Sequence, residues 1–146
     1  MSTLQYLGRR LGTPSTIIFT ALFAIVINLA VYGIGTLAGG TFDFTDKGSA
    51  YHVDALTLIG FTAVPLLVGL TLVAIVSRLW RWVNPIALVL APIAAIGTIF
   101  TMTLPADLDT TSTVTLAITH VVVAIAVASG IVALRSPSPK SAFRFA

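Results

Sequence analysis

The fold is decided by residues 54–82, which read DALTLIGFTAVPLLVGLTLVAIVSRLWRW. One carboxylate, Asp54, opens the stretch, and apolar or small residues then continue without a charge until the basic and aromatic run at residues 78–82. A helix needs about 20 such residues to cross about 30 Å of hydrocarbon. The stretch therefore predicts a transmembrane helix over residues 54–77, with Asp54 as its N-cap.

Three further stretches have the same character, at about residues 17–38, 84–104 and 113–134. Because 57% of the residues are hydrophobic and only 9% are charged, the composition also favours a membrane protein. The first stretch is longer than the core of a signal peptide, so we interpret it as a retained helix, capped by Ser15 or Thr16. We expect an all-α membrane protein, a four-transmembrane-helix up-down bundle forming a single membrane domain over residues 1–146.

Charged residues divide between the two ends of this bundle. All the acidic residues lie in or beside the first and third connections. The basic residues, apart from Lys47, precede the first helix, join the second to the third, or follow the fourth. The positive-inside rule then places both termini in the cytoplasm of a multi-pass protein of the cytoplasmic membrane. The net charge of +3 has no aromatic interleaving, so nucleic acid is not expected as a partner.

The connections and prolines suggest local structure. The outer loop 39–53 contains aromatic residues among aspartates, so we expect it at the interface, where a short strand pair is one option. The tail 135–146 is expected in the cytoplasm, either flexible or held against the lipid surface. Helix kinks are predicted at Pro65, Gly69 and Pro92. Interfacial anchors are predicted at Arg78, Trp80, Arg81 and Trp82.

The sequence lacks the residues that several kinds of catalytic and metal-binding sites require. The chain has no cysteine, which excludes disulfides, thiolate catalysis and cysteine-bound metal clusters. Its two histidines, His52 and His120, fall in a loop and in one helix, so they do not form the facing pair of a di-haem site. A histidine without a paired acid or nucleophile lacks the second group that acid–base catalysis requires. We therefore expect no enzyme activity, no cofactor and no metal site.

Polar residues within the spans form the candidate site. Small residues let helices approach closely, so polar groups on the same faces are expected inside the bundle. The helical rise of about 1.5 Å per residue places one such group of each helix at a similar depth, with Asn28 about one turn deeper. The inner faces are expected to include Ala21, Ala24 and Gly35 in the first helix and Ala87, Ala91 and Ala94 in the third. The candidate polar layer or ligand site consists of Asn28, Tyr32, Thr62, Thr98 and His120.

His120 has several possible roles in this layer. We expect it to bond to Tyr32 or Asn28. A helix–helix hydrogen bond is the favoured role, while contact with a ligand, haem or ion, or a proton relay, stays open.

The chain also resembles an uncharacterised group of small four-helix membrane proteins found mainly in actinobacteria. The residues that carry the likeness are Asn28, the run VPLLVG at 64–69, TLP at 103–105 with Asp107, and THVVV at 119–123. The resemblance implies the four-span architecture and importance for Asn28, Pro65 and His120. It implies no activity.

Two functions follow from these observations. The favoured one is a non-enzymatic integral membrane protein that associates with itself or with a larger membrane complex through its small-residue helix faces. The alternative is a small transporter or ligand-binding membrane protein with a site around His120, near the outer side of the membrane. The lipid bilayer is the expected surrounding in both cases.

Overall fold

A computed structural model describes residues 12–135, and these residues form four long helices and one β-hairpin. The elements are α2 (Thr13–Leu37), β1 (Asp43–Asp46), β2 (Ser49–His52), α3 (Ala55–Leu79), α4 (Val83–Thr98), the π-helix η1 (Ile99–Thr103) that continues α4, and α5 (Thr110–Leu134). Each of α2, α3, α5 and the combined α4–η1 is long and apolar enough to cross a membrane. The prediction of a four-helix, all-α membrane protein is confirmed. Arg9, Arg10 and the tail beyond residue 135 lie outside the described residues.

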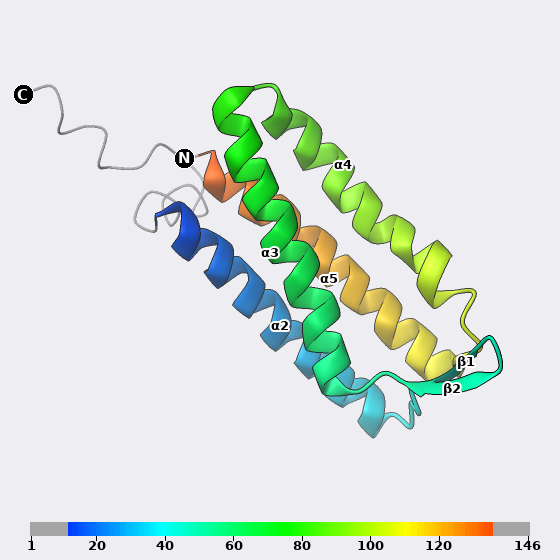
Figure 1. Cartoon of the computed structure of the whole chain (residues 1–146). Coiled ribbons are helices and arrows are strands. Elements are labelled where there is room, and N and C mark those ends of the chain that lie inside the picture. The colour runs from blue at the N-terminus through cyan, green and yellow to red at the C-terminus, as the bar shows by residue number, and fades with distance from the viewer. Residues whose placement is uncertain (1–11, 136–146) are drawn as a thin grey trace, which may run out of the picture.

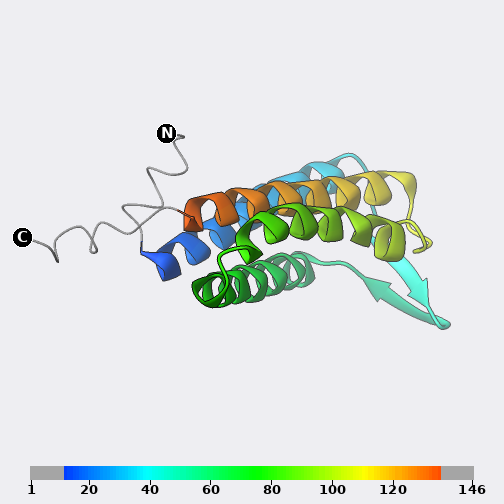
Figure 2. The ribbon, with the colours of Figure 1, turned by 90° about the horizontal axis from the view of Figure 1, so that it is seen from above.

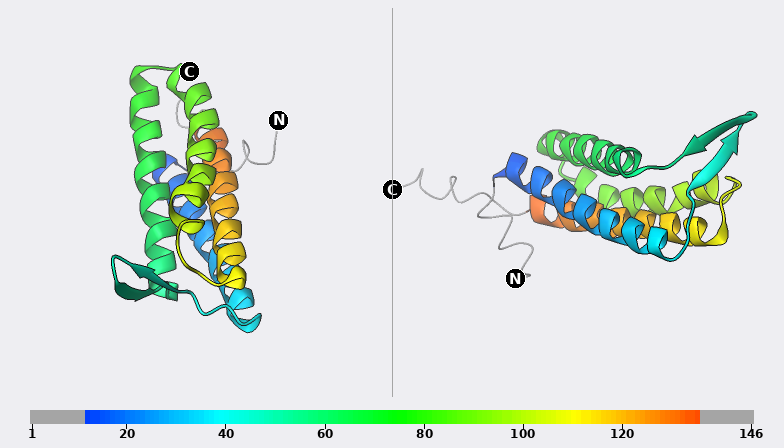
Figure 3. Two further views of the ribbon diagram at one scale, coloured as in Figure 1. Left: turned by 90° about the vertical axis from the view of Figure 1, so that its right-hand side faces the viewer. Right: turned by 90° about the horizontal axis from the view of Figure 1, so that it is seen from below.

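Successive helices run in opposite directions (Figure 1). The hairpin and the start of α5 lie at one end, which we call the hairpin end, and the α3–α4 turn lies at the other, which we call the turn end. Helix α2 packs against α3 and α5, and α5 packs against α4 on its other side. The hairpin projects beyond the helix ends, as the view from above shows (Figure 2). The right-hand view in Figure 3 also shows the strands extending past the first residues of α3.

The helix starts follow local capping chemistry. Helix α2 begins at Thr13, after Gly12 in extended backbone, and has no side-chain cap, so the expectation of Ser15 or Thr16 as the cap was wrong. Pro14 explains the earlier start, because its fixed φ suits the first turn, where no amide partner is needed. Asp54 does cap α3, since its carboxylate accepts the Thr57 amide at 2.7 Å.

The three residues predicted to kink the helices all lie inside continuous helices. Helix α3 runs through Pro65 and α4 runs through Pro92 without a break in helical structure. The degree of bending at Pro65, Gly69 and Pro92 stays a prediction. A feature that the sequence did not reveal is the change from α-helix to π-helix after Thr98.

The interior lies between α2, α3 and α5. Gly130 of α5 faces Leu70, whose methyl carbons would lie about 3 Å from an added Cβ. The core contains Ile17, Ala21, Ala24, Leu66, Leu70, Ala126, Val127 and Ile131. Ala21, Ala24, Asn28 and Gly35 are buried as expected, and Ala87 and Ala91 pack against the core.

One residue assigned to the inner face of α4 is placed differently. Ala94 is exposed, whereas Ala95 is half-buried, so the assignment of Ala94 was wrong. With 3.6 residues per turn, the face that begins at Ala87 and Ala91 continues to Ala95 before reaching Thr98. The inner face is therefore displaced by one residue from the expected spacing in the middle of α4.

The loop 39–53 is an ordered antiparallel hairpin. Phe44 pairs with Tyr51 in the ladder, and their rings stack with centroids 5.5 Å apart. Lys47 and Gly48 form the two-residue turn with φ values of 50° and 80°. Positive φ at both positions matches the type I′ turns that suit the twist of β-hairpins. The strand pair that the sequence left as an option is present.

Candidate functional site

The sequence placed Tyr32, Thr62, Thr98 and His120 at one depth and Asn28 about one turn deeper, whereas in the structure Asn28 lies beside Thr62. Gly35 lies against Thr115, and Thr20 lies beside Gly130, which fixes the antiparallel register of α2 and α5. In this register His120 is offset from Asn28 by two residues, or roughly 3 Å along the helix axis. The residues do not form one connected network, however, and instead make separate pairs.

The first pair joins α2 to α3. The Nδ2 of Asn28 donates to the hydroxyl oxygen of Thr62 at 2.9 Å. The exposed fractions of the two residues are 1% and 2%, so the bond is inside the bundle. The amide oxygen of Asn28 is buried and has no partner among the described residues. Because a single threonine hydroxyl can pair with only one end of the amide, this pair leaves one polar atom unsatisfied.

The second pair joins α4 to α5. The Nδ1 of His120 lies 2.8 Å from the hydroxyl oxygen of Thr98. The expectation that His120 bonds to Tyr32 or Asn28 was therefore wrong. The reason is the helix arrangement, because α4 packs on the side of α5 away from α2 and brings Thr98 to the ring. Tyr32 instead donates its hydroxyl to the carbonyl of Val53, before α3, at 3.0 Å.

Asp109 organises the hairpin end. One carboxylate oxygen caps α5 by accepting the Ser112 amide at 2.9 Å. The other accepts the amide and the hydroxyl of Thr41, both at 3.0 Å, and also the Ser112 hydroxyl. These bonds favour the ionised form and hold the pKa of Asp109 far below its ordinary value, the Ser112 contacts having the largest effect. A single side chain thus ties the loop after α2 to the start of α5.

Two other aspartates have similar structural roles. Asp107 accepts the Thr45 amide of β1 at 2.6 Å, which anchors the hairpin to the segment before α5. The Thr45 and Thr57 hydrogen bonds lower the pKa values of Asp107 and Asp54, respectively. Topogenic and capping roles were expected for these aspartates. The bonds across the hairpin end were not, because nothing in the spacing shows which distant amide a carboxylate meets.

Phe42 is the residue at this end that the sequence reasoning missed. Its exposed fraction is 1%, and its ring centroid lies 4.4 Å from that of Tyr32. Its φ of 57° lies in the left-handed region, which is unusual for a bulky residue. Its amide donates to the Ser112 hydroxyl at 2.9 Å, and its carbonyl accepts the Val53 amide. These contacts hold the strained backbone and seal the bundle interior at the hairpin end.

An apolar groove runs between α2 and α5 near the hairpin end. Gly35 and Thr115 are its buried residues, and the Thr115 hydroxyl bonds to its own helix at Thr111. The groove measures about 430 Å³. It is lined by Val31, Ile34, Gly35, Ala38, Thr110, Thr111, Val114, Thr115 and Ile118. Its surface is therefore suited to an apolar occupant.

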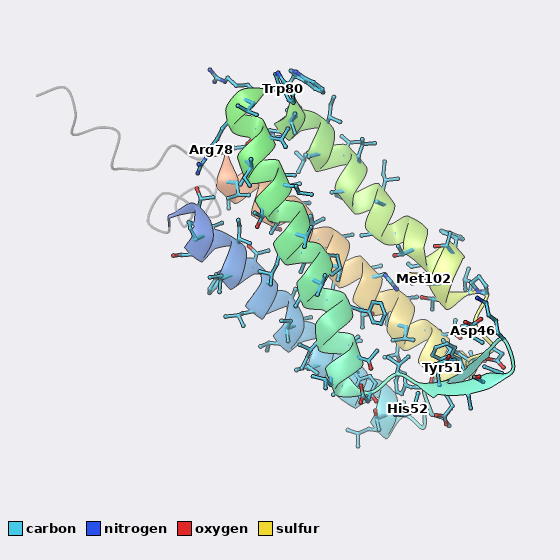
Figure 4. The ribbon with its side chains drawn as sticks, viewed as in Figure 1. Asp46, Tyr51, His52, Arg78, Trp80 and Met102 are labelled. Atoms are coloured by element: carbon cyan, nitrogen blue, oxygen red, sulfur yellow. The ribbon has the colours of Figure 1, made fainter. Side chains whose placement is uncertain are left out.

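The candidate interfacial anchors lie at the turn end of the bundle, away from the hairpin. Trp80, Arg81 and Trp82 are exposed at the turn end, and Figure 4 shows Arg78 and Trp80 opposite Asp46, Tyr51 and His52 of the hairpin. The Nδ1 of His52 lies 2.8 Å from a carboxylate oxygen of Asp43, and both side chains are exposed. Arginines and tryptophans thus lie at one end of the bundle and aspartates at the other, as expected of a membrane protein. The role of Arg78, Trp80, Arg81 and Trp82 as interfacial anchors stays a prediction.

Within residues 12–135, no three His, Cys, Asp or Glu side chains gather in a way that could hold a metal ion.

Comparison with known proteins identifies the family of this chain. The model of a family described as "Family of unknown function (DUF6069)" matches residues 9–136. Neither the curated proteins nor the solved structures yielded a match.

Proposed function

This chain belongs to DUF6069, a family of unknown function, and from that premise we propose that it is a non-enzymatic membrane subunit. It associates with a second copy of itself or with a larger membrane complex. It resides in the cytoplasmic membrane with both termini inside, because the basic residues gather at the turn end and beyond the first and last helices. The hairpin then faces outward.

The observation that carries this proposal is the pairing of the polar side chains. Asn28 pairs with Thr62, and Thr98 pairs with His120, each bond joining two helices. Hydrogen bonds of this kind hold helices together in hydrocarbon, where water is not available as a partner. A transport site would instead need these groups to converge on one cavity. The pairing supports a structural role and gives less support to the alternative of a small transporter.

The association surface that we propose is the groove between α2 and α5. Gly35 lets α2 and α5 lie close together beneath the groove, since an added Cβ there would overlap the Thr115 side chain. Ile34 stands beside it with 67% of its surface exposed. A glycine beside protruding apolar side chains allows two helices to pack closely in a membrane. A second copy offers both features and can form a symmetric contact with this face.

Cysteine cross-linking tests the proposal, because the natural chain has no cysteine. Ile34→Cys places a thiol at the groove, and Ile93→Cys places one on α4 at a similar exposed fraction, 61%. In native membranes treated with an oxidant, the Ile34→Cys protein should form disulfide-linked dimers faster than the Ile93→Cys protein. Equal rates for the two variants would remove the groove as the self-association surface.

A further inference from the structure

The seam between α4 and α5 contains a linked pair of hydrogen bonds. The hydroxyl of Thr98 donates to the carbonyl of Ala95 and lies 2.8 Å from the Nδ1 of His120. A hydroxyl has one hydrogen, and a carbonyl can only accept. The Thr98 hydrogen therefore goes to Ala95, and the Thr98 oxygen accepts from His120. This arrangement requires a proton on Nδ1.

The bond from the Thr98 hydroxyl to Ala95 is a common one in helices, and Ser77 and Thr119 likewise donate to the carbonyl three residues earlier. In a regular α-helix the amide of Ile99 would bond to the carbonyl of Ala95. Here that amide is directed to the carbonyls of Ile96 and Gly97 instead, at the start of η1. The carbonyl of Ala95 accepts from the Thr98 hydroxyl. This bond orients the hydroxyl of Thr98, and Thr98 in turn fixes which nitrogen of His120 carries the proton.

A consequence follows for the other nitrogen of the ring. A charged imidazole is costly in hydrocarbon, so the ring is neutral and Nε2 has a free lone pair. Nε2 has no hydrogen-bond partner within the described part of the chain, and His120 is only half-buried. Nε2 is not among the fully buried, unpartnered side-chain atoms of the described residues. An acceptor is therefore accessible from the lipid.

We infer that Nε2 of His120 binds the hydroxyl of a hydrophobic phenol or quinol dissolved in the membrane. His120 lies about 15 Å along α5 from its first residue, so the donor must enter the hydrocarbon. Hydroxyls of lipid head groups stay at the interface, whereas an apolar ring carries a phenolic hydroxyl to this depth. A phenolic hydroxyl donates one hydrogen bond, which matches the single open lone pair. This inference does not depend on the association proposed above.

The test uses nuclear magnetic resonance of the full chain with isotope-labelled histidine in lipid nanodiscs. The chain has two histidines, so the His52→Gln variant assigns the His120 signals. Before any addition, the proton should be found on Nδ1. Nonylphenol should then shift the Nε2 signal to saturation, while its methyl ether, which has no hydroxyl hydrogen, should leave the signal unchanged.

Substitutions at Thr98 provide the second measurement. In the Thr98→Val protein, Nδ1 loses its acceptor, and the affinity for nonylphenol should fall by at least about twofold because half of the rings take the other tautomer. Thr101→Val, at an exposed position of η1, is the matched control and should keep the affinity. A proton on Nε2 in the natural protein, an equal response to the methyl ether, or a bond from Nε2 to water that nonylphenol does not displace would overturn the inference.

Discussion

Asn28 on α2 donates a hydrogen bond to Thr62 on α3 across 2.9 Å, although 34 positions separate the two residues in the chain. Both side chains are buried within spans that are otherwise almost wholly apolar. In hydrocarbon, an unpaired amide would be costly, so the bond fixes both the rotation and the register of the two helices. The pair is accordingly the first place to measure the stability of the bundle.

Replacing Thr62 by valine, which has nearly the same shape, removes the acceptor for Asn28. We expect the free energy of unfolding in detergent to fall by about 1–2 kcal/mol, since the Asn28 amide is then left unpaired. The Asn28→Leu protein and the double variant complete a mutant cycle. If the two single effects add within about 0.3 kcal/mol, the bond has no role in stability.

Gly35 and Gly33 lie on the same helix and provide a matched pair. A Cβ at Gly35 would overlap the Thr115 side chain, whereas a Cβ at Gly33 would meet nothing within 4 Å. Gly35→Ala should therefore reduce the free energy of unfolding by about 1–3 kcal/mol. Gly33→Ala should leave it unchanged or raise it, because alanine favours helix. Thermal unfolding in detergent compares the two, and equal effects would show that α2 and α5 are not closely packed at Gly35.

Asp109 should make stability depend on pH. Its pKa in the folded protein lies below the ordinary value of 3.8, so its contribution is complete above that pH and decreases as the pH falls below it. Asp109→Asn should lower the melting temperature at neutral pH, and the difference from the natural protein should shrink in acid. Asp46→Asn, on the exposed hairpin, is the control. A difference that is independent of pH would contradict the role of the carboxylate.

The predicted orientation can be checked with single cysteines at the two bundle ends. Lys47→Cys lies in the hairpin turn, and Arg81→Cys lies in the turn between α3 and α4. A membrane-impermeant maleimide added to intact cells should label the first variant, and it should label the second only after the membrane is opened. The reverse pattern would place the termini outside and would show that the distribution of basic residues does not set this topology.

Much of the fold could be predicted from the sequence, because span length and charge are local properties of each segment. The same reasoning placed Asn28 and His120 in the interior of their spans, since position along a helix depends only on the distance from its end. It did not find the partner of His120. That partner depends on which side of α5 is covered by α4, and small residues on both faces of α5 left this choice open.

The hairpin end was the least predictable part. Phe42 lies between Thr41 and Asp43 with no pattern that distinguishes it, yet it is buried in a left-handed conformation. Its position depends on bonds to Ser112 and Val53, which are distant in the sequence. The π-helix after Thr98 was likewise invisible, because it arises from packing and not from a composition signal.

The most direct test of the central claim, that this bundle works as an associating subunit, is a native mass spectrum of the protein extracted gently from its own membrane. The account predicts a defined oligomer or a stoichiometric complex with another membrane protein. A monomer with no protein partner, observed under conditions that preserve other membrane complexes, would contradict it.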